Sequence, residues 1–275
     1  MTDHRMFTTA AASAIAACCL IAAGGAARAD EPLVWHEDYF TAYKQAEREG
    51  KQLFIFFRDE QQAHTADSYE LTVLTDKILQ EPLRKFVLAV IPIDYTLPET
   101  GEKLLDFEAF QYQQHRQGIA VVDLVDSSSP LHGKVVSSHP FSHGRHLTAH
   151  STKIVLELPR GTITQRSLIY AARINPYKPA GAQGKATFEL LKFSASHSDA
   201  MANWNSMYHS SFGGPEIVAN IGPGATIVDT AKSIINMWQG SPPHWGILTR
   251  AHRRFGLDMK RSASGHWYAT GVFGN

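Results

Sequence analysis

Continuous apolar runs that alternate with helical patterns constrain the fold of this chain most strongly. The run "LFIFF", Leu53 to Phe57, follows a helical pattern from which Gly50 separates it. A second run, "FVLAVIPIDY", comes after another helical stretch near 69–85. Strands that are apolar at every position are buried on both faces, as in sheets packed between helices. The first half of the chain therefore predicts an α/β sheet covered on both faces.

Further strands and helices follow from the same criteria. The strings "GIAVVDLVD" and "KVVSSHPF" predict a strand pair joined by a Ser/Pro/Gly turn. Helical periodicity predicts a helix that stops at Asn175-Pro176, one that ends near His209, and one begun by Thr226 and closed by Gly240. A short strand at 216–221 and a final hairpin turned at 262–265 complete the predicted elements. The helix ending near His209 is defined by one stripe: Phe193, His197, Met201, Trp204 and Tyr208.

The first 29 residues have the pattern of a secretory signal peptide. An Arg5-bearing start precedes an alanine-rich apolar stretch, and Ala27-Arg28-Ala29 precedes Asp30. The apolar stretch is shorter than the ~20 residues of a membrane-spanning helix, so we expect an exported chain, periplasmic or extracellular, that begins near Asp30 without a transmembrane helix. The apolar run continues past Cys18, which argues against a lipoprotein anchor.

Cysteine usage and charge exclude several functional classes. Cys18 and Cys19 both lie in the signal segment, so the processed chain is expected to have neither disulfides nor thiolate chemistry. Lys plus Arg and Asp plus Glu number 26 each without long runs of one sign, so no nucleic-acid partner is predicted. The length of 275 residues accommodates two domains, which we place at 30–158 and 162–275.

The order of elements from Trp35 to Phe141 resembles the thioredoxin-like superfamily. In that family the C-x-x-C dithiol follows the first central strand, where this chain has "RDEQQAH", Arg58 to His64. The position of the family's cis-proline corresponds to Gly118-Ile119-Ala120, which has no proline. The resemblance therefore implies a thioredoxin-like α/β domain that serves as a redox-inactive scaffold and is not a thiol-disulfide oxidoreductase.

Several histidines of the first half carry no recognisable ligand spacing. His64 is expected in a solvated loop after a strand. Five further histidines are irregularly spaced, and neither C-x-x-C nor H-E-x-x-H accompanies them, so we expect them in a surface loop. They are His132, His139, His143, His146 and His150. On the helical stripe of the second half, His197 is predicted to be a hydrogen-bonded core or boundary residue.

One histidine of the second half has a well-defined local setting. In "GSPPHWGIL", Ser241 is a favourable N-cap and Pro242 a favourable first helical residue. His244 then lies in the first helical turn, where the helix dipole disfavours an imidazolium. We therefore expect a neutral His244, suited to accept a hydrogen bond or to bind a metal.

Motifs across 162–275 resemble the CAP superfamily, also called SCP-like proteins. The matching strings are "MYHSS", "EIVA", "W..SPPHW" and "FGLDM...G.WYATGVFG". The resemblance implies an α-β-α sandwich in which His209, Glu216 and His244 converge in a cleft that can hold a divalent metal. Many members have a second glutamate where this chain has Ser241, so the fourth ligand is missing.

The chemistry of this residue set allows two interpretations. Two imidazoles and one carboxylate with an open fourth position can hold zinc. Alternatively, Glu216 accepts hydrogen bonds from His209 and His244 and joins helix, strand and loop without a metal. Spacing along the chain does not distinguish the two.

Three functions remain open from sequence. The first is a non-catalytic exported binding protein that holds a small ligand, or an envelope protein or glycan, at the His209, Glu216, Ser241 and His244 cleft. The second is a metal-dependent hydrolase in which Glu216 or His209 acts as general base, although no G-x-S-x-G motif is present. The third is a cell-envelope interaction module that binds through exposed aromatics such as Trp245, Trp267 and Tyr268, although core packing would also place aromatics at these positions.

Overall fold

The computed structural model describes residues 32–142, 144–222 and 225–275 of an α/β protein with two mixed sheets. The predicted signal segment, with both cysteines, lies outside the described residues, as does His143. Residues 32–275 form one compact unit. The division into two domains at 158–162 therefore stays a prediction.

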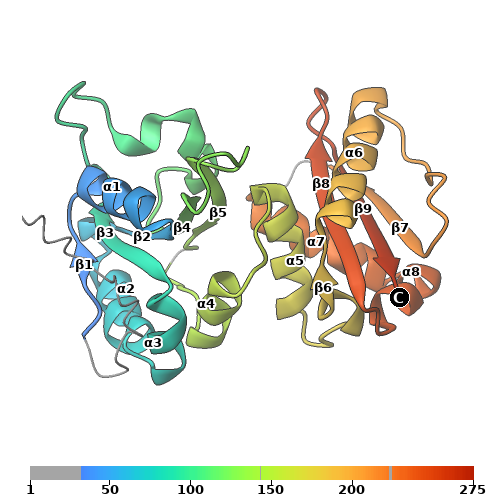
Figure 1. The fold of residues 1–275 in the computed structure, drawn as a ribbon, viewed down its shortest axis with the longest axis horizontal. Helices are drawn as coiled ribbons and strands as arrows, with labels where there is room; N and C mark the ends of the chain where they lie inside the picture. The colour runs from blue at the N-terminus through green and yellow to red at the C-terminus, as the bar shows by residue number, and fades with distance from the viewer. Residues whose placement is uncertain (1–31, 143, 223–224) are drawn as a thin grey trace, which may run out of the picture. The chain divides into compact units, whose positions relative to one another are not determined.

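The first sheet has the order β1-β3-β2-β4-β5 (Figure 1). Its strands are β1 (Trp35–His36), β2 (Gln52–Arg58), β3 (Phe86–Pro92), β4 (Gly118–Asp123) and β5 (Lys134–Pro140). Both β1 and β2 are parallel to β3, whereas β4 is antiparallel to β2 and to β5. The strand β2 is thus the central strand.

Side-chain alternation along β2 explains why both faces of this sheet are covered. Phe54 and Phe56 pack on one face against α2 (Ala63–Ser68), the π-helix η2 (Tyr69–Leu74), α3 (Lys77–Leu83) and α4 (Ala149–Leu156). Leu53, Ile55 and Phe57 pack on the other against α1 (Tyr39–Glu49) and the 3-10 turns η3 (Leu104–Asp106) and η4 (Glu108–Gln113). A further 3-10 turn, η1 (Glu60–Gln62), precedes α2. The predicted two-sided burial is confirmed.

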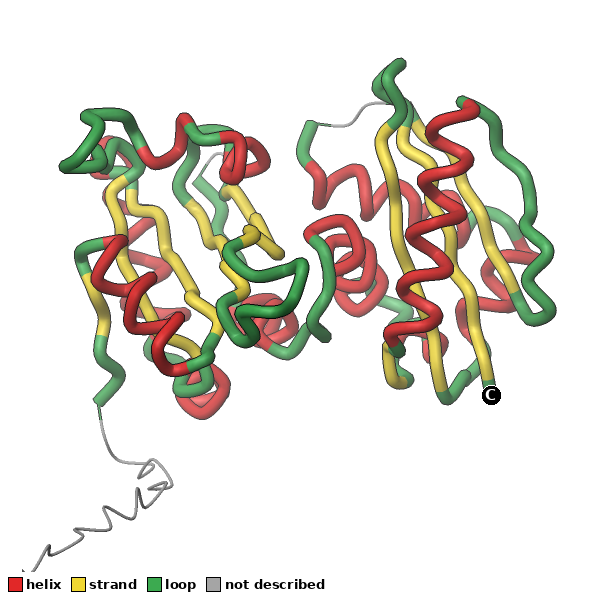
Figure 2. Tube along the Cα trace, turned by 45° about the horizontal axis from the view of Figure 1, so that its top comes forward, coloured by secondary structure: helices red, strands yellow, loops and turns green. Residues whose placement is uncertain are grey.

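The second sheet has the order β6-β8-β9-β7. Its strands are β6 (Lys185–Ala186), β7 (Glu216–Ile221), β8 (Arg254–Arg261) and β9 (Trp267–Gly274). Four α-helices precede or connect them: α5 (Ile163–Ile174), α6 (Phe188–Trp204), α7 (Ile227–Gln239) and α8 (Pro242–Thr249), with the 3-10 turn η5 (Ala180–Ala182) after α5. Figure 2 shows red helices beside both yellow sheets.

Side chains alternate along the strands of the second sheet, so that successive residues pack on opposite faces. Val218 and Tyr268 pack against Met201 and Ala202 of α6. The neighbouring strand residues, such as Leu257 and Ala269, belong to the large core shared with α5 and α7. Gly256 allows α6 to lie close to β8, because a side chain there would collide with the backbone of Leu190. Helices therefore cover both faces of this sheet as well.

Most predicted elements of the second half are confirmed, but one helix is shorter than predicted. The helix α5, the strand β7, the helix α7 and the hairpin β8-β9 lie where periodicity placed them. The helix α6, in contrast, ends at Trp204, because Asn205 adopts the left-handed conformation (φ 49°). Trp204 is consequently exposed, and Tyr208 lies outside the helix. His197 is buried and bonds to the carbonyl of Tyr208, as expected of a core histidine.

The predicted surface loop of histidines is wrong for His139 and His150, whereas His132 and His146 lie in turn or loop segments. His139 belongs to β5, is 3% exposed and has its ring 4.5 Å from that of Tyr170. His146 bonds to Ser68, and His150 lies in α4, a helix that the sequence analysis did not predict. Burial in the tertiary fold, which periodicity over so few residues does not reveal, is the reason for the difference.

A buried arginine connects the first sheet to the helices that follow it. The Arg166 side chain of α5 donates from Nε to Ser137 of β5 at 2.7 Å. Its Nη atoms donate to the carbonyls of Val155, Leu158 and Pro159 at the end of α4. Burial lowers the pKa of Arg166 to about 10. Because of these hydrogen bonds, all three guanidinium nitrogens of Arg166 are paired in the interior.

Within the described ranges 32–142, 144–222 and 225–275, none of the helices has both the length and the apolar character that crossing a bilayer requires.

Replacing Arg166 with Met should lower the free energy of unfolding by about 3 kcal/mol, because buried acceptors lose their donor. Urea unfolding monitored by circular dichroism measures the loss. Arg173→Met is the matched control, since Arg173 also donates to two carbonyls but is only partly buried; we expect about 1 kcal/mol there. Equal losses in the two variants would contradict a special role for Arg166.

Acid should destabilise the protein through His139. Burial lowers the pKa of His139 to about 3 in the folded state, whereas the unfolded value is about 6.5. The unfolded chain therefore binds the proton first, and stability falls as the pH decreases from about 6.5 towards 3. In His139→Phe, unfolding free energies between pH 7 and pH 4 should decline less steeply than in the parent. An exposed control, His266→Phe, should keep the parental slope; parallel curves for all three proteins would refute the assignment.

Candidate functional site

The candidate site of the second half is organised around Glu216, the first residue of β7. Strand pairing with β9 places Glu216 opposite Val272. The carboxylate lies at the strand end with only 6% of its side chain exposed. A buried carboxylate needs internal donors, and the loop 205–215 that precedes β7 supplies them.

Both carboxylate oxygens of Glu216 accept hydrogen bonds from that loop. The Nδ1 atom of His209 and the backbone N–H of Ser210 each donate to Oε2 at 2.9 Å. The Ser210 hydroxyl donates to Oε1. His197 lies just beyond, with Nε2 3.9 Å from Oε1 and donating to the carbonyl of Tyr208. Glu216 therefore fixes the loop through charge-assisted hydrogen bonds.

His209 and His244 lie next to each other at the surface of this cluster. Their ring centroids are 6.3 Å apart and the rings are close to parallel. The His209 side chain is 59% exposed. Because Nδ1 of His209 donates to Glu216, its Nε2 is the ring nitrogen left for an external partner. The structure thus brings together three of the predicted site residues.

The expected neutrality of His244 agrees with the direction of its pKa shift. The pKa of His244 lies below its ordinary value because of partial burial first and the neighbouring His209 second. Pro242 occupies the first turn of α8, after Ser241 as N-cap.

Ser241 occupies the predicted N-cap position of α8 but does not bond to it through its side chain. Among the contacts of the described residues, none joins that hydroxyl to His209, Glu216 or His244. Ser210 is instead the serine at the site, and sequence reasoning missed it; its signal was only its position beside His209.

The residues do not fit a metal centre in this arrangement. In the part of the chain that the structure describes, no group of three or more His, Cys, Asp or Glu side chains is placed to hold a metal ion. Glu216 and Nδ1 of His209 are bonded to each other. The geometry corresponds to the hydrogen-bonded alternative for Glu216 and His209.

Two of the aromatics predicted to be exposed are buried. Trp267 and Tyr268 on β9 are each 4% exposed, and Trp245 on α8 is partly buried. The alternation of β9 turns Trp267 towards the large core and Tyr268 towards α6. The expectation that these two rings present a binding surface is wrong.

The segment that replaces the dithiol in the thioredoxin-like resemblance forms a charge cluster. Arg58 at the end of β2 donates to Glu60, Asp67 and Glu70 at 2.7, 2.8 and 2.9 Å. These hydrogen bonds, led by the one to Glu60, raise the pKa of Arg58. Strand pairing places Gly118 opposite Phe57, beside this segment.

No family model matches the chain, and no curated protein matches it. The resemblances noted from sequence therefore remain proposals, and the geometry of the described residues carries the functional argument.

His209→Ala should raise the pKa of His244, because the neighbouring imidazole is one of the two causes of its shift. The pKa should stay below the ordinary value, since partial burial persists. A pH titration of the His244 ring protons by NMR measures the change. His266→Ala, which alters an exposed histidine of the β8-β9 turn, should leave it unchanged; an unaltered His244 titration in His209→Ala would contradict the coupling.

Proposed function

We propose that the chain is an exported, non-catalytic binding protein, with a ligand site at His209, Glu216 and His244 in an SCP-like half and a redox-inactive, thioredoxin-like first half. The observation that carries this proposal is the state of Glu216. Its two oxygens accept three hydrogen bonds from its own loop. A carboxylate engaged in this way holds a surface in shape and is not free to act as a general base.

The two histidines provide the recognition chemistry. His209 is exposed and oriented by Glu216, and His244 lies beside it with a lowered pKa. Neutral imidazole nitrogens accept hydrogen bonds from hydroxyl or amide donors. A polar ligand with such donors, small or presented by an envelope protein or glycan, is the partner class that this pair suits.

The topology of each sheet supports the family resemblance proposed for that half of the chain. In the first sheet, β2 is the central strand, and the Arg58 segment follows it where the dithiol of the resembled family would lie. In the second, helices lie on both faces of the sheet, which suits the proposed α-β-α sandwich (Figure 1). Export rests on the sequence of residues 1–29.

Metal analysis of the chain from Asp30 to Asn275 separates binding from metal-dependent hydrolysis. After incubation with zinc and dialysis, we expect no stoichiometric metal, and the same result in His209→Ala and His244→Ala. One zinc per chain, lost in both variants, would overturn the proposal and favour the hydrolase.

The proposed redox inactivity of the first half is tested by insulin reduction. Turnover above the uncatalysed rate would refute an inactive scaffold.

The binding part is tested with fragments. In an NMR screen of neutral sugars and amides, ligands of the site should shift the ring signals of His209 and His244 together. These shifts should disappear in Glu216→Gln, which keeps the size of the side chain but replaces one acceptor oxygen with a donor group. Fragments that bind this variant as well as the parent would place recognition elsewhere.

A further inference from the structure

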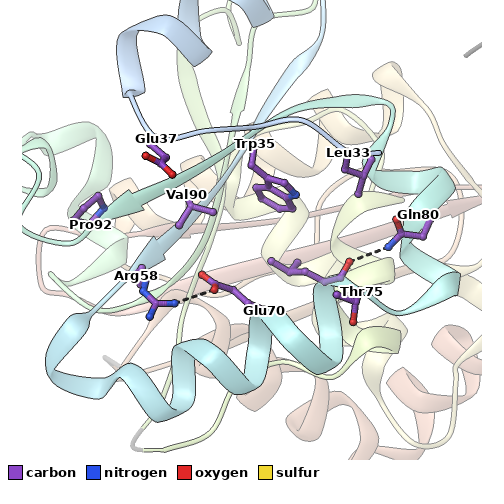
Figure 3. Close-up of a pocket in the computed structure, with 10 residues that line it drawn as sticks. Leu33, Trp35, Glu37, Arg58, Glu70, Thr75, Gln80, Val90 and Pro92 are labelled. Atoms are coloured by element: carbon purple, nitrogen blue, oxygen red, sulfur yellow. Dashed lines mark hydrogen bonds and ion pairs between the residues drawn. The ribbon is translucent and has the colours of Figure 1, made fainter. Parts of the chain in front are cut away.

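A large pocket lies beside the first sheet, away from the His209 cluster. Its volume is about 790 Å³, within the ~300–1,000 Å³ typical of small-molecule sites. Figure 3 shows its lining side chains, which come from the N-terminal segment, β1, the ends of β2 and β3, and the segment from η2 to α3. They are Leu33, Trp35, Glu37, Arg58, Glu70, Leu74, Thr75, Gln80, Val90 and Pro92.

One part of this pocket is an apolar wall. Trp35 lies between Val90 and Leu33 in Figure 3 and is only half-buried. The edge-to-face contact with Phe54, at 6.1 Å between centroids, orients the indole. The wall can therefore receive an apolar body, and its aromatic ring can also attract a cation.

The other part of the pocket is negatively charged. Each of the three guanidinium nitrogens of Arg58 already donates to a carboxylate, so Arg58 is committed within the protein. Among the lining residues, the charge of Glu70 balances that of Arg58, while Glu60 and Asp67 lie outside the lining. Glu37 lines the same pocket, is exposed, and gives the lining one negative charge in surplus. A ligand cation is favoured, whereas a ligand anion is repelled.

The π-helix η2 positions two of the lining residues. It contributes Glu70, which accepts from Arg58, and Leu74, which belongs to the apolar wall. The Gln80 amide donates to the carbonyl of Leu74 at 3.0 Å and thereby holds the end of η2 (Figure 3). Tyr69 at its start is fully buried and bonded to Thr152. The charged and apolar parts of the pocket are therefore held in one geometry.

We propose that this pocket binds a small cationic amphiphile. The apolar body of the ligand packs on Trp35, Leu74 and Val90. Its ammonium or guanidinium group lies towards the carboxylates of Glu37 and Glu70. The first half is then a second binding unit, and this assignment does not depend on the function proposed for His209, Glu216 and His244.

Three ligands of matched chain length test the charge preference. Isothermal titration of the chain from Asp30 to Asn275 with n-octylammonium, octanol and octanoate at low ionic strength should rank them in that order. We expect octylammonium to bind about fivefold more tightly than octanol, the scale of a partly exposed charge interaction. This advantage should decrease with added salt. Equal affinities, preference for octanoate or no binding of octylammonium would each overturn the proposal.

Charge variants locate the recognition. Glu37→Gln and Glu70→Gln should each weaken octylammonium binding several-fold and leave octanol binding unchanged. Glu60→Gln is the matched control, because it removes the same charge and another Arg58 contact but Glu60 is not among the lining residues. A loss in Glu60→Gln as large as in Glu37→Gln would show a long-range effect only and overturn the local site.

A larger side chain in the pocket tests the apolar wall. Val90→Trp, verified as folded by circular dichroism, should fill the pocket and abolish binding of octylammonium and octanol. Retained binding would place both ligands elsewhere and overturn the proposal.

Discussion

The buried guanidinium of Arg166 is the interaction on which the arrangement of this protein depends most. Removing a cation from water costs several kcal/mol, and only the assembled fold offsets this cost. The acceptors come from β5 and from the end of α4. They fix the position of α5, whose Thr164 in turn bonds to the buried Asp258 of β8 at 2.6 Å. Any other packing of α5 would leave these polar groups unpaired.

Glu216 has a similar part on a smaller scale. Its burial at the start of β7 requires donors, and the loop 205–215 provides them through Ser210 and His209. The side chain therefore orients the exposed imidazole of His209. The same hydrogen bonds engage both oxygens of Glu216 and leave Nε2 of His209 for an external partner. In the first half, Arg58 shows the same principle, because one cation holds three segments of chain but leaves a local excess of negative charge.

Local signals predicted much of the fold. Thr226 and Gly240 bound α7 as the sequence predicts, and the Thr226 side chain accepts from the backbone N–H of Asp229. The sequence also indicated His209, Glu216 and His244, of which the structure joins the first two directly. It failed at Asn205, where a single left-handed residue ends α6, and at His139, whose burial depends on packing against α5. Neither result follows from periodicity.

The sequence by itself determined the α/β class, the central strands buried on both faces and the limits of α7, because these depend on residues near one another in the chain. Tertiary structure decided which groups meet. Only folding brought Ser210, in place of Ser241, to Glu216, buried Trp267 and Tyr268, and placed Trp35 near Glu70 around one pocket. Such contacts join distant segments, and their energies depend on burial and on the pairing of charges, which no local pattern encodes.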